Sequence, residues 1–248
     1  MKSEAEIIVG IHALEAALKY QASDIHEIWI DAHRHDERVQ KIISLIKKAG
    51  LKFNKVSRDY LDDQFKGQRH QGVAAHVLPG KVGTESDLQN IIKNSSQAFI
   101  LILDGVTDPH NLGACLRSAD AAGVDAVIVP KDRAVGLTAT VRKVASGAAE
   151  RVPLIQVTNL ARVLRDLKDA GLWTVGLAGE SDQNLYESDL KGPIALVMGA
   201  EGEGMRRLTK EHCDFLVYIP MAGSVESLNV SVAAGVSLFE VVRQRQLK

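Results

Sequence analysis

Cysteine is scarce in this sequence, and its scarcity excludes two kinds of site. Cys115 and Cys213 are the only cysteines among 248 residues, and neither stands in a CxxC or Cys/His pattern. Disulfide-stabilised domains and structural zinc sites need more thiols at closer spacing. We therefore expect two semi-buried thiols, no metal ion, and a protein suited to a reducing cytosol.

An excess of charge of one sign is also missing. The formal net charge of the chain is −1. A nearly neutral chain has no overall field that attracts polyanions. Any binding of nucleic acid must therefore depend on local clusters of Lys and Arg.

Long hydrophobic runs are absent too. No uncharged stretch reaches the ~18 apolar residues that a membrane-spanning helix needs. The first residues, MKSEAEIIVGIHALEAAL, carry acids where a signal peptide has basic residues, and they lack a sustained apolar region. We expect a cytoplasmic protein with no membrane contact.

The length and patterning predict two modules. Residues 1–78 alternate between helix-like segments, IHALEAALKY and DERVQKIISLIKKAG, and strand-like segments, HEIWI, LKF and GVAAHV. They predict a small α/β domain. The stretch that follows, PGKVGTESD, is rich in turn formers, so we expect a linker over residues 79–97.

Residues 98–248 have a different pattern. Six near-continuous apolar runs occur here: FILIL, AVIVP, VPLIQV, LWTVGL, IALVM and FLVYIP. Such runs are typical of parallel strands buried on both faces, with helices above and below. The final helical segment carries Leu228, Val232, Val236 and Phe239 along one stripe.

The loop MGAEGEGMRR follows one of these strands and resembles a nucleotide-binding loop only in its glycines. Phosphate-binding loops direct backbone N–H groups at the anion, whereas Glu201 and Glu203 would repel it. The order GxxGxG also differs from the dinucleotide fingerprint GxGxxG. The loop favours a ligand that is uncharged or cationic here, such as adenosine attached to a sulfonium, or else it is a solvated turn.

Two further loops carry polar residues. In IPMAGSVESLNVSVAAGV the chain leaves a strand at Ile219 and is expected to enter a helix at Ser227, which is an N-cap residue type. This loop could hold a heterocycle or merely cap the helix. In DGVTDPHNLGACLRSADAAGV, Asn111 opens a helix and Arg117 lies among small apolar residues. Such an arginine needs a phosphate or a salt bridge.

Taken together, the three loops resemble a known family. The segments NLGACLRSADAAG, LVMGAEGEGM and IPMAGSVESLNVSVAAG, in this order and each after an apolar strand, are similar to the three signature motifs of the SpoU/TrmH branch of the SPOUT methyltransferases. By its segments GIHAL and HQGVAAHV, the front module resembles the L30e/L7Ae-type RNA-binding domain that precedes this catalytic domain in several members.

The resemblance implies a mostly parallel α/β catalytic domain whose C-terminal segment forms a trefoil knot. It implies that S-adenosylmethionine binds in the knot, largely through backbone groups, and that the chain forms a homodimer. The implied cofactor-binding residues are Gly199, Ile219 and Leu228. The implied catalytic residues are Asn111, Arg117, Glu201, Ser227 and Asn229.

The activity implied by the resemblance is 2′-O-methylation of a guanosine ribose in 23S ribosomal RNA, with neither DNA nor a metal involved. A transfer RNA substrate, or a non-catalytic RNA-binding factor in ribosome assembly, is the alternative. Because a guanidinium normally stays protonated, we expect Arg117 to position a phosphate and stabilise the developing alkoxide rather than act as a base. The candidate RNA-binding cations are Arg142, Lys143, Arg151, Arg206 and Arg207.

Overall fold

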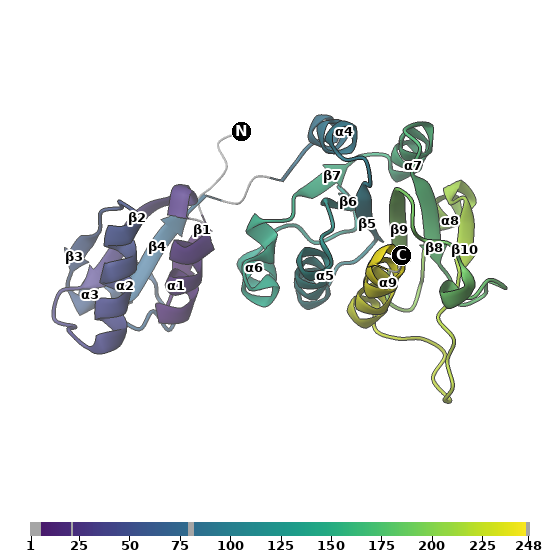
Figure 1. Cartoon of the computed structure of the whole chain (residues 1–248). Coiled ribbons are helices and arrows are strands. Elements are labelled where there is room, and N and C mark those ends of the chain that lie inside the picture. Colours follow the sequence, from purple (N-terminus) through teal and green to yellow (C-terminus); the bar gives the residue numbers. More distant parts are fainter. Residues whose placement is uncertain (1–5, 21, 79–81, 247–248) are drawn as a thin grey trace. The chain divides into compact units, whose positions relative to one another are not determined.

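The computed structural model describes residues 6–20, 22–78 and 82–246. They form two compact units, one within residues 1–81 and the other within residues 82–248 (Figure 1). None of the helices among these residues is long and apolar enough to cross a bilayer.

The first unit is built on a four-stranded sheet in the order β1-β4-β2-β3. Strand β4 runs antiparallel to β1 and β2, whereas β2 and β3 are parallel. The strands are β1 (Glu6–Val9), β2 (Ile25–Asp31), β3 (Asn54–Val56) and β4 (Val73–Val77). The helices are α1 (Ile11–Tyr20), the short η1 (Ala22–Asp24), α2 (Glu37–Lys48) and α3 (Arg58–Gln64).

Helices α1 and α2 of this unit pack together and bury Leu14, Ile42 and Ile46 with the sheet. A second, smaller cluster joins Trp29 of β2 to Leu61 of α3. The predicted α/β module is confirmed. Its third strand begins at Asn54, after the LKF segment in which it was expected.

The second unit contains a six-stranded sheet in the order β10-β8-β9-β5-β6-β7, and every neighbouring pair is parallel. Its strands are β5 (Phe99–Asp104), β6 (Ala126–Pro130), β7 (Leu154–Val157), β8 (Trp173–Leu177), β9 (Ile194–Gly199) and β10 (Phe215–Val217). All six residues of β5 are buried. The prediction of a parallel sheet from near-continuous apolar runs is therefore confirmed.

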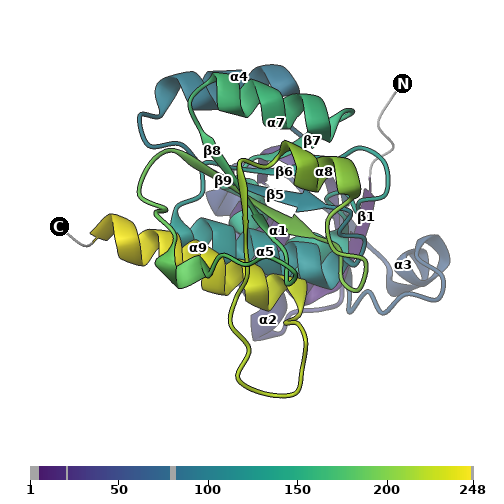
Figure 2. The ribbon, with the colours of Figure 1, turned by 90° about the vertical axis from the view of Figure 1, so that its right-hand side faces the viewer.

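Helices cover both faces of this sheet. One face is packed by α5 (Pro109–Ala122), α6 (Ala139–Ala145) and α9 (Val230–Gln246), and the other by α4 (Glu85–Asn94), α7 (Leu160–Asp169) and α8 (Arg207–His212). The short helices are η2 (Ala148–Glu150) and η3 (Leu185–Glu187). Figure 2 shows α4, α7 and α8 on one side of the strands and α5 and α9 on the other.

Helix α4 lies within the segment expected to be a linker, and this expectation is corrected from Val82 onward. Thr84 and Asp87 form a capping box at its start, so the polar residues that suggested a linker are a helix N-cap. Leu88 is buried in the core on one face of the second sheet. Residues 79–81 lie outside the described residues.

Helix α9 begins at Val230, so the expected start at Ser227 is wrong. Asn229 is the capping residue, since its Oδ1 accepts the Ser231 N–H at 2.9 Å. The buried face of α9 includes Ala234 and Leu238. Of the stripe predicted from the sequence, Val236 packs against the core, whereas Val232 and Phe239 are about half exposed.

Candidate active site

The predicted cofactor-binding residues meet at the carboxyl end of the parallel sheet. Ligands in open α/β folds bind outside this edge of the strands. An open cleft of about 220 Å³ lies here. Its lining includes five residues that the sequence motifs single out: Gly199, Glu201, Ile219, Ser227 and Leu228.

The glycine-rich loop forms a tight hairpin at the end of β9. Ala200 and Gly204 exchange backbone hydrogen bonds of 3.1 and 2.9 Å. Gly202 has a φ of 81°, which favours glycine. A Cβ on Gly199 would lie 2.1 Å from the carbonyl carbon of Gly204. The absence of a side chain at Gly199 therefore lets the end of the hairpin pack against it.

A buried carboxylate holds the far end of this loop. Asp104 ends β5 and is the register partner of Gly199. Its carboxylate is completely shielded from solvent and accepts Arg206 Nε at 2.7 Å and the Arg206 backbone N–H at 3.0 Å. Asp104 was not predicted as a site residue, although an acid that ends the apolar run FILILD indicates a paired buried charge.

Three polar side chains from distant parts of the chain join at the cleft. Asn111 Nδ2 donates to Glu201 Oε2 at 3.2 Å. Asn229 Nδ2 lies 3.0 Å from Asn111 Oδ1 and 3.3 Å from Glu201 Oε1. The structure therefore brings together three of the five predicted catalytic residues, with Ser227 lining the same cleft.

Arg117, the fifth predicted catalytic residue, lies apart from the other four. Helix α5 begins at a turn in which Asp108 Oδ1 accepts the His110 N–H, and this turn places Asn111 in the first helical turn. Arg117 lies further along the same helix, on a different face from Asn111. Its side chain is exposed, does not line the cleft, and makes no hydrogen bond or ion pair with any described residue. Within one chain, therefore, Arg117 is not part of the network of Asn111, Glu201 and Asn229.

The charges at the cleft suit a cationic ligand. Glu180, Glu201 and Glu226 line it, against one cation, Lys210. The Lys210 ammonium donates to the Glu180 carboxylate and lowers the pKa of that carboxyl below its ordinary value. Glu180 thus remains ionised at neutral pH. Since Leu177, Met198 and Val217 supply apolar walls, the lining fits an adenosyl group joined to a sulfonium.

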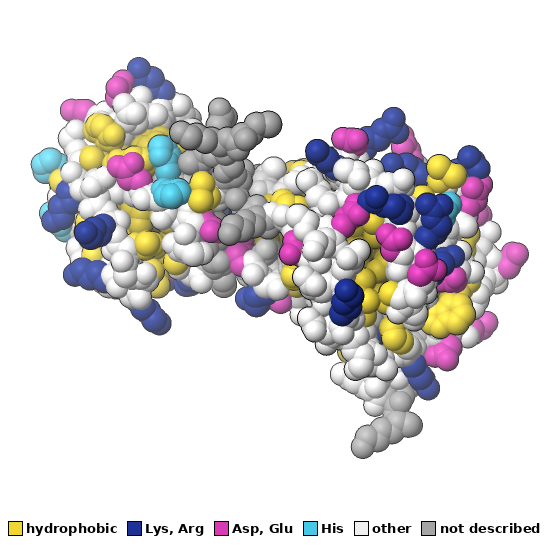
Figure 3. All heavy atoms as spheres, turned by 90° about the horizontal axis from the view of Figure 1, so that it is seen from above, with side chains coloured by type: hydrophobic (Ala, Val, Ile, Leu, Met, Phe, Trp, Pro, Cys, Tyr) yellow, Lys and Arg dark blue, Asp and Glu magenta, His cyan; other side chains and the backbone are white. Residues whose placement is uncertain are grey.

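The cations proposed from the sequence for RNA binding do not form a cluster. Four of them are bound to carboxylates: Arg142 to Glu150, Arg151 to Asp120, Arg206 to Asp104, and Arg207 to Glu211. Figure 3 shows Lys and Arg side chains interspersed with Asp and Glu on one face of this unit. The fifth, Lys143, is exposed and has no carboxylate partner among the described residues.

The cysteines do not contribute a reactive thiolate. Cys115 is buried and Cys213 is partly buried, and neither forms a disulfide. Burial raises the pKa of each thiol to about 12, so both are protonated at neutral pH. Among the residues that the structure describes, no three His, Cys, Asp or Glu side chains are grouped as metal ligands would be.

Comparison with known proteins identifies the family. Residues 98–239 match the SpoU rRNA Methylase family, and residues 7–81 match the domain described as RNA 2′-O ribose methyltransferase substrate binding. The chain belongs to the SpoU rRNA methylase family. The family resemblance carried by the three loops is thus confirmed.

The similarity to individual SpoU proteins extends over nearly the whole chain. The chain is 60% identical to the 23S rRNA (guanosine-2′-O-)-methyltransferase RlmB of Yersinia pestis, over 98% of this chain and 99% of that one. A crystal structure described as an RNA 2′-O ribose methyltransferase is 28% identical, with a TM-score of 0.73 and coverage of 99% and 90%. AviRb from Streptomyces viridochromogenes, crystallised with AdoMet, shares the fold with a TM-score of 0.78 at 24% identity, covering 98% of this chain and 91% of that one.

Proposed function

We propose that this SpoU protein transfers a methyl group from S-adenosylmethionine to the ribose 2′-oxygen of a guanosine in 23S ribosomal RNA. One observation carries the proposal: positions of two motifs line one cleft, and the hydrogen bonds that Asn111 of the first motif makes with Glu201 and Asn229 join that motif to them beside the cleft. The full-length similarity to a 23S rRNA methyltransferase supports the choice of substrate.

Different side chains of the site bind the cofactor and position the groups that bind it. Glu201, the backbone of the 200–204 hairpin, Ile219 and Leu228 line the cleft and would hold the cofactor. When bound, S-adenosylmethionine supplies a methyl group on a positively charged sulfur and leaves as a neutral thioether. Asn111 and Asn229 hold the Glu201 carboxylate in one orientation. Such fixed positioning supplies much of the acceleration in a transfer between two bound groups.

Arg117 is assigned to the RNA side of the reaction. Its guanidinium stays protonated and has donors only, so it can bind a phosphate next to the target ribose and stabilise negative charge developing on the 2′-oxygen. Because Arg117 is exposed and lies outside the cleft of its own chain, we assign it to the site of a second copy in a homodimer. The half-exposed Val232 and Phe239 of α9 fit an apolar contact between the two copies.

Two alternative functions differ from this proposal, one in its RNA substrate and the other in having no catalytic activity. A transfer RNA substrate would use the same site. A non-catalytic assembly factor would not need the network of Asn111, Glu201 and Asn229, so the retained network weighs against it. The proposed location is the cytoplasm, where ribosomal RNA is assembled in bacteria, and the trefoil knot remains an expectation from the family.

Mapping of ribose methylation in ribosomal and transfer RNA, with and without the gene, tests the substrate. Loss of one guanosine methylation in 23S rRNA is expected, and an unchanged rRNA pattern contradicts the proposal.

Calorimetry with S-adenosylmethionine tests whether the protein is a methyltransferase, since a non-catalytic factor would not bind this cofactor. Arg117→Ala should abolish methyl transfer and leave cofactor affinity nearly unchanged, whereas the control Arg165→Ala, at an exposed arginine of α7, should retain both.

A further inference from the structure

The first unit contains a second cleft, which is polar. None of the residues that line it belongs to the three motifs. The cleft has a volume of about 480 Å³. The segment after β2, the start of α2, helix α3 and the turn before β4 surround it. Four arginines line it, against two aspartates: Arg34, Arg38, Arg58 and Arg69, with Asp31 and Asp62.

The walls of this cleft are held in place by buried contacts. The His70 side chain is buried, and its Nε2 lies 2.8 Å from Asp62 Oδ1 while its Nδ1 accepts the Gly72 N–H at 3.1 Å. Gly72 has a φ of 74°, and a Cβ there would lie 2.9 Å from Arg34 Cδ. The turn before β4 is therefore fixed against α3 on one side and against Arg34 on the other.

The four arginines differ in how many of their guanidinium donors are hydrogen-bonded within the protein. Arg34 donates to Asp36 Oδ2 at 2.6 Å and to the carbonyl oxygen of Gln71. Arg58 has only a long contact of 3.8 Å with Asp62. Arg38 and Arg69 are exposed, and neither guanidinium has a partner among the described residues. Two guanidinium groups thus face the cleft with all their donors available.

Guanidinium groups in a fixed cleft suit phosphate oxygens. Their planar donors bind a phosphate at two points, and an apolar ligand would leave these donors without acceptors. RNA–protein contacts in folded RNA go largely to phosphates and 2′-hydroxyls. The side-chain amide of Gln68 lines the same cleft and offers both a donor and an acceptor for a hydroxyl.

We propose that this arginine cleft binds the sugar–phosphate backbone of the substrate RNA, with Arg38 and Arg69 as the phosphate contacts. The proposal rests on the proposed function, since it takes the RNA to be the methylated substrate. The match of residues 7–81 to a substrate-binding domain agrees with it. It also accounts for a neutral chain that binds a polyanion, because the cations gather in one cleft.

The test is the affinity of the full chain for unmodified 23S rRNA fragments, measured over a range of salt concentrations. The variant Arg38→Ala/Arg69→Ala should bind about 10- to 100-fold more weakly, as expected for the loss of two charge-assisted contacts. Its slope of log affinity against log salt should fall by about 1.5, since each phosphate contact contributes roughly 0.7 to 0.9. In methylation assays the defect should appear in KM rather than in kcat.

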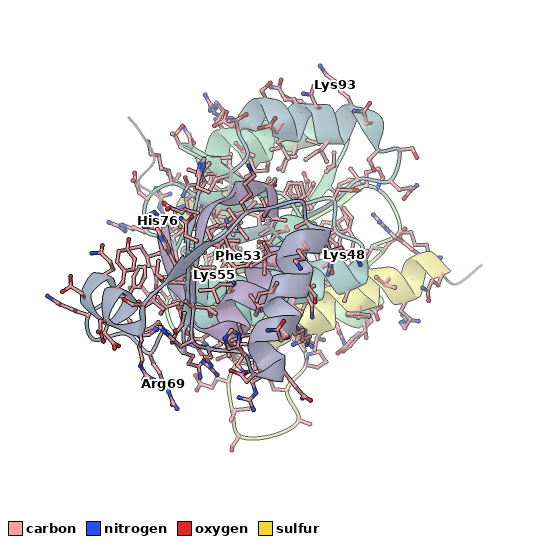
Figure 4. The ribbon with its side chains drawn as sticks, turned by 90° about the vertical axis from the view of Figure 1, so that its left-hand side faces the viewer. Lys48, Phe53, Lys55, Arg69, His76 and Lys93 are labelled. Atoms are coloured by element: carbon pink, nitrogen blue, oxygen red, sulfur yellow. The ribbon has the colours of Figure 1, made fainter. Side chains whose placement is uncertain are left out.

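The matched control is Lys47→Ala/Lys48→Ala, which removes the same charge from the last turn of α2. Figure 4 shows Lys48 and Arg69 on well-separated parts of the first unit. Binding equal to this control, with an equal salt slope, would overturn the proposal, as would competition by polyglutamate as effective as that by RNA. A wild-type chain that binds RNA but never methylates it would refute the proposed function and leave the cleft assignment intact.

Discussion

Arg206 Nε lies 2.7 Å from Asp104 Oδ1, and the Asp104 carboxylate has no exposure to solvent. The two residues join the end of β5 to the segment that leaves the glycine-rich hairpin. Since Asp104 also accepts the Arg206 backbone N–H, one buried acid fixes the position of a loop that lines the cofactor cleft.

Removing the arginine should destabilise the protein. Arg206→Ala leaves a buried carboxylate with one backbone donor, which should cost about 1–3 kcal/mol of the free energy of unfolding. The neighbouring Arg207→Ala breaks an exposed pair with Glu211 and should cost less than about 0.5 kcal/mol. Chemical denaturation measures the difference, and calorimetry should reveal weaker S-adenosylmethionine binding by Arg206→Ala only. Equal stability of the two variants would contradict the assignment.

Gly199→Ala should disturb the hairpin directly. The added Cβ would lie 2.1 Å from backbone atoms of residues 204 and 205, so the loop must move, at a cost of about 1–3 kcal/mol. Gly223→Ala is the control, because a Cβ there meets nothing within 4 Å. Thermal unfolding with and without S-adenosylmethionine should show that the ligand stabilises the control and fails to stabilise Gly199→Ala. Equal ligand stabilisation in both would rule out this role.

The stability of the first unit should depend on Glu15 in acid. Hydrogen bonds from Lys41 and then Lys19 lower the pKa of Glu15 from 4.5 to about 2. A lowered carboxyl pKa contributes stability that is present above pH 4.5 and is lost as the pH falls toward 2. Glu15→Gln should therefore lower the denaturation midpoint at pH 7, and its difference from wild type should shrink between pH 4.5 and pH 2.

Tryptophan fluorescence can follow this unit alone. The chain has two tryptophans, a buried Trp29 in the first unit and a largely exposed Trp173 in the second. In a Trp173→Phe background, the signal reports the surroundings of Trp29. The control Asp63→Asn, whose contact with Lys66 is exposed, should have little effect at any pH. A Glu15→Gln effect that does not change with pH would contradict the ion-pair explanation.

Phe239→Glu should separate the proposed dimer. The Phe239 side chain is 49% exposed on α9, and a carboxylate there would be unfavourable in an apolar interface. Sedimentation should give a monomer that binds S-adenosylmethionine but does not transfer methyl groups. Leu208→Glu changes an equally exposed leucine on α8 (51%), and this control should leave a dimer. A dimeric and active Phe239→Glu protein would exclude α9 from the interface.

The sheet could be predicted because its signal is local. Strands buried on both faces are uninterrupted apolar runs. FILIL and IALVM can therefore be recognised as strands without knowing which strands they pair with. The start of α9 was harder, because Ser227 and Asn229 are both capping types. The bonds from Asn229 to Asn111 and Glu201 favour the later position, and these bonds depend on tertiary contacts that composition does not encode.

Charged residues were the least predictable part of the site. Arg206 looked like an RNA-binding cation because its partner, Asp104, is far away in the chain and adjacent only across the sheet. Arg38 and Arg69 were overlooked for the same reason, since only the turn before β4 brings them to one cleft. The function of a cation depends on its counter-ion, and the spacing of residues in a sequence does not reveal that counter-ion.

The hydrogen-bonded network of Asn111, Glu201 and Asn229 also sets an order of events during synthesis. Its members are contributed by α5, by the loop after β9 and by the residue that precedes the last helix. A nascent chain has the first two side chains long before it has the third. The first 228 residues must therefore be synthesised before the three side chains can meet, and a chain terminated ahead of Asn229 would lack the network.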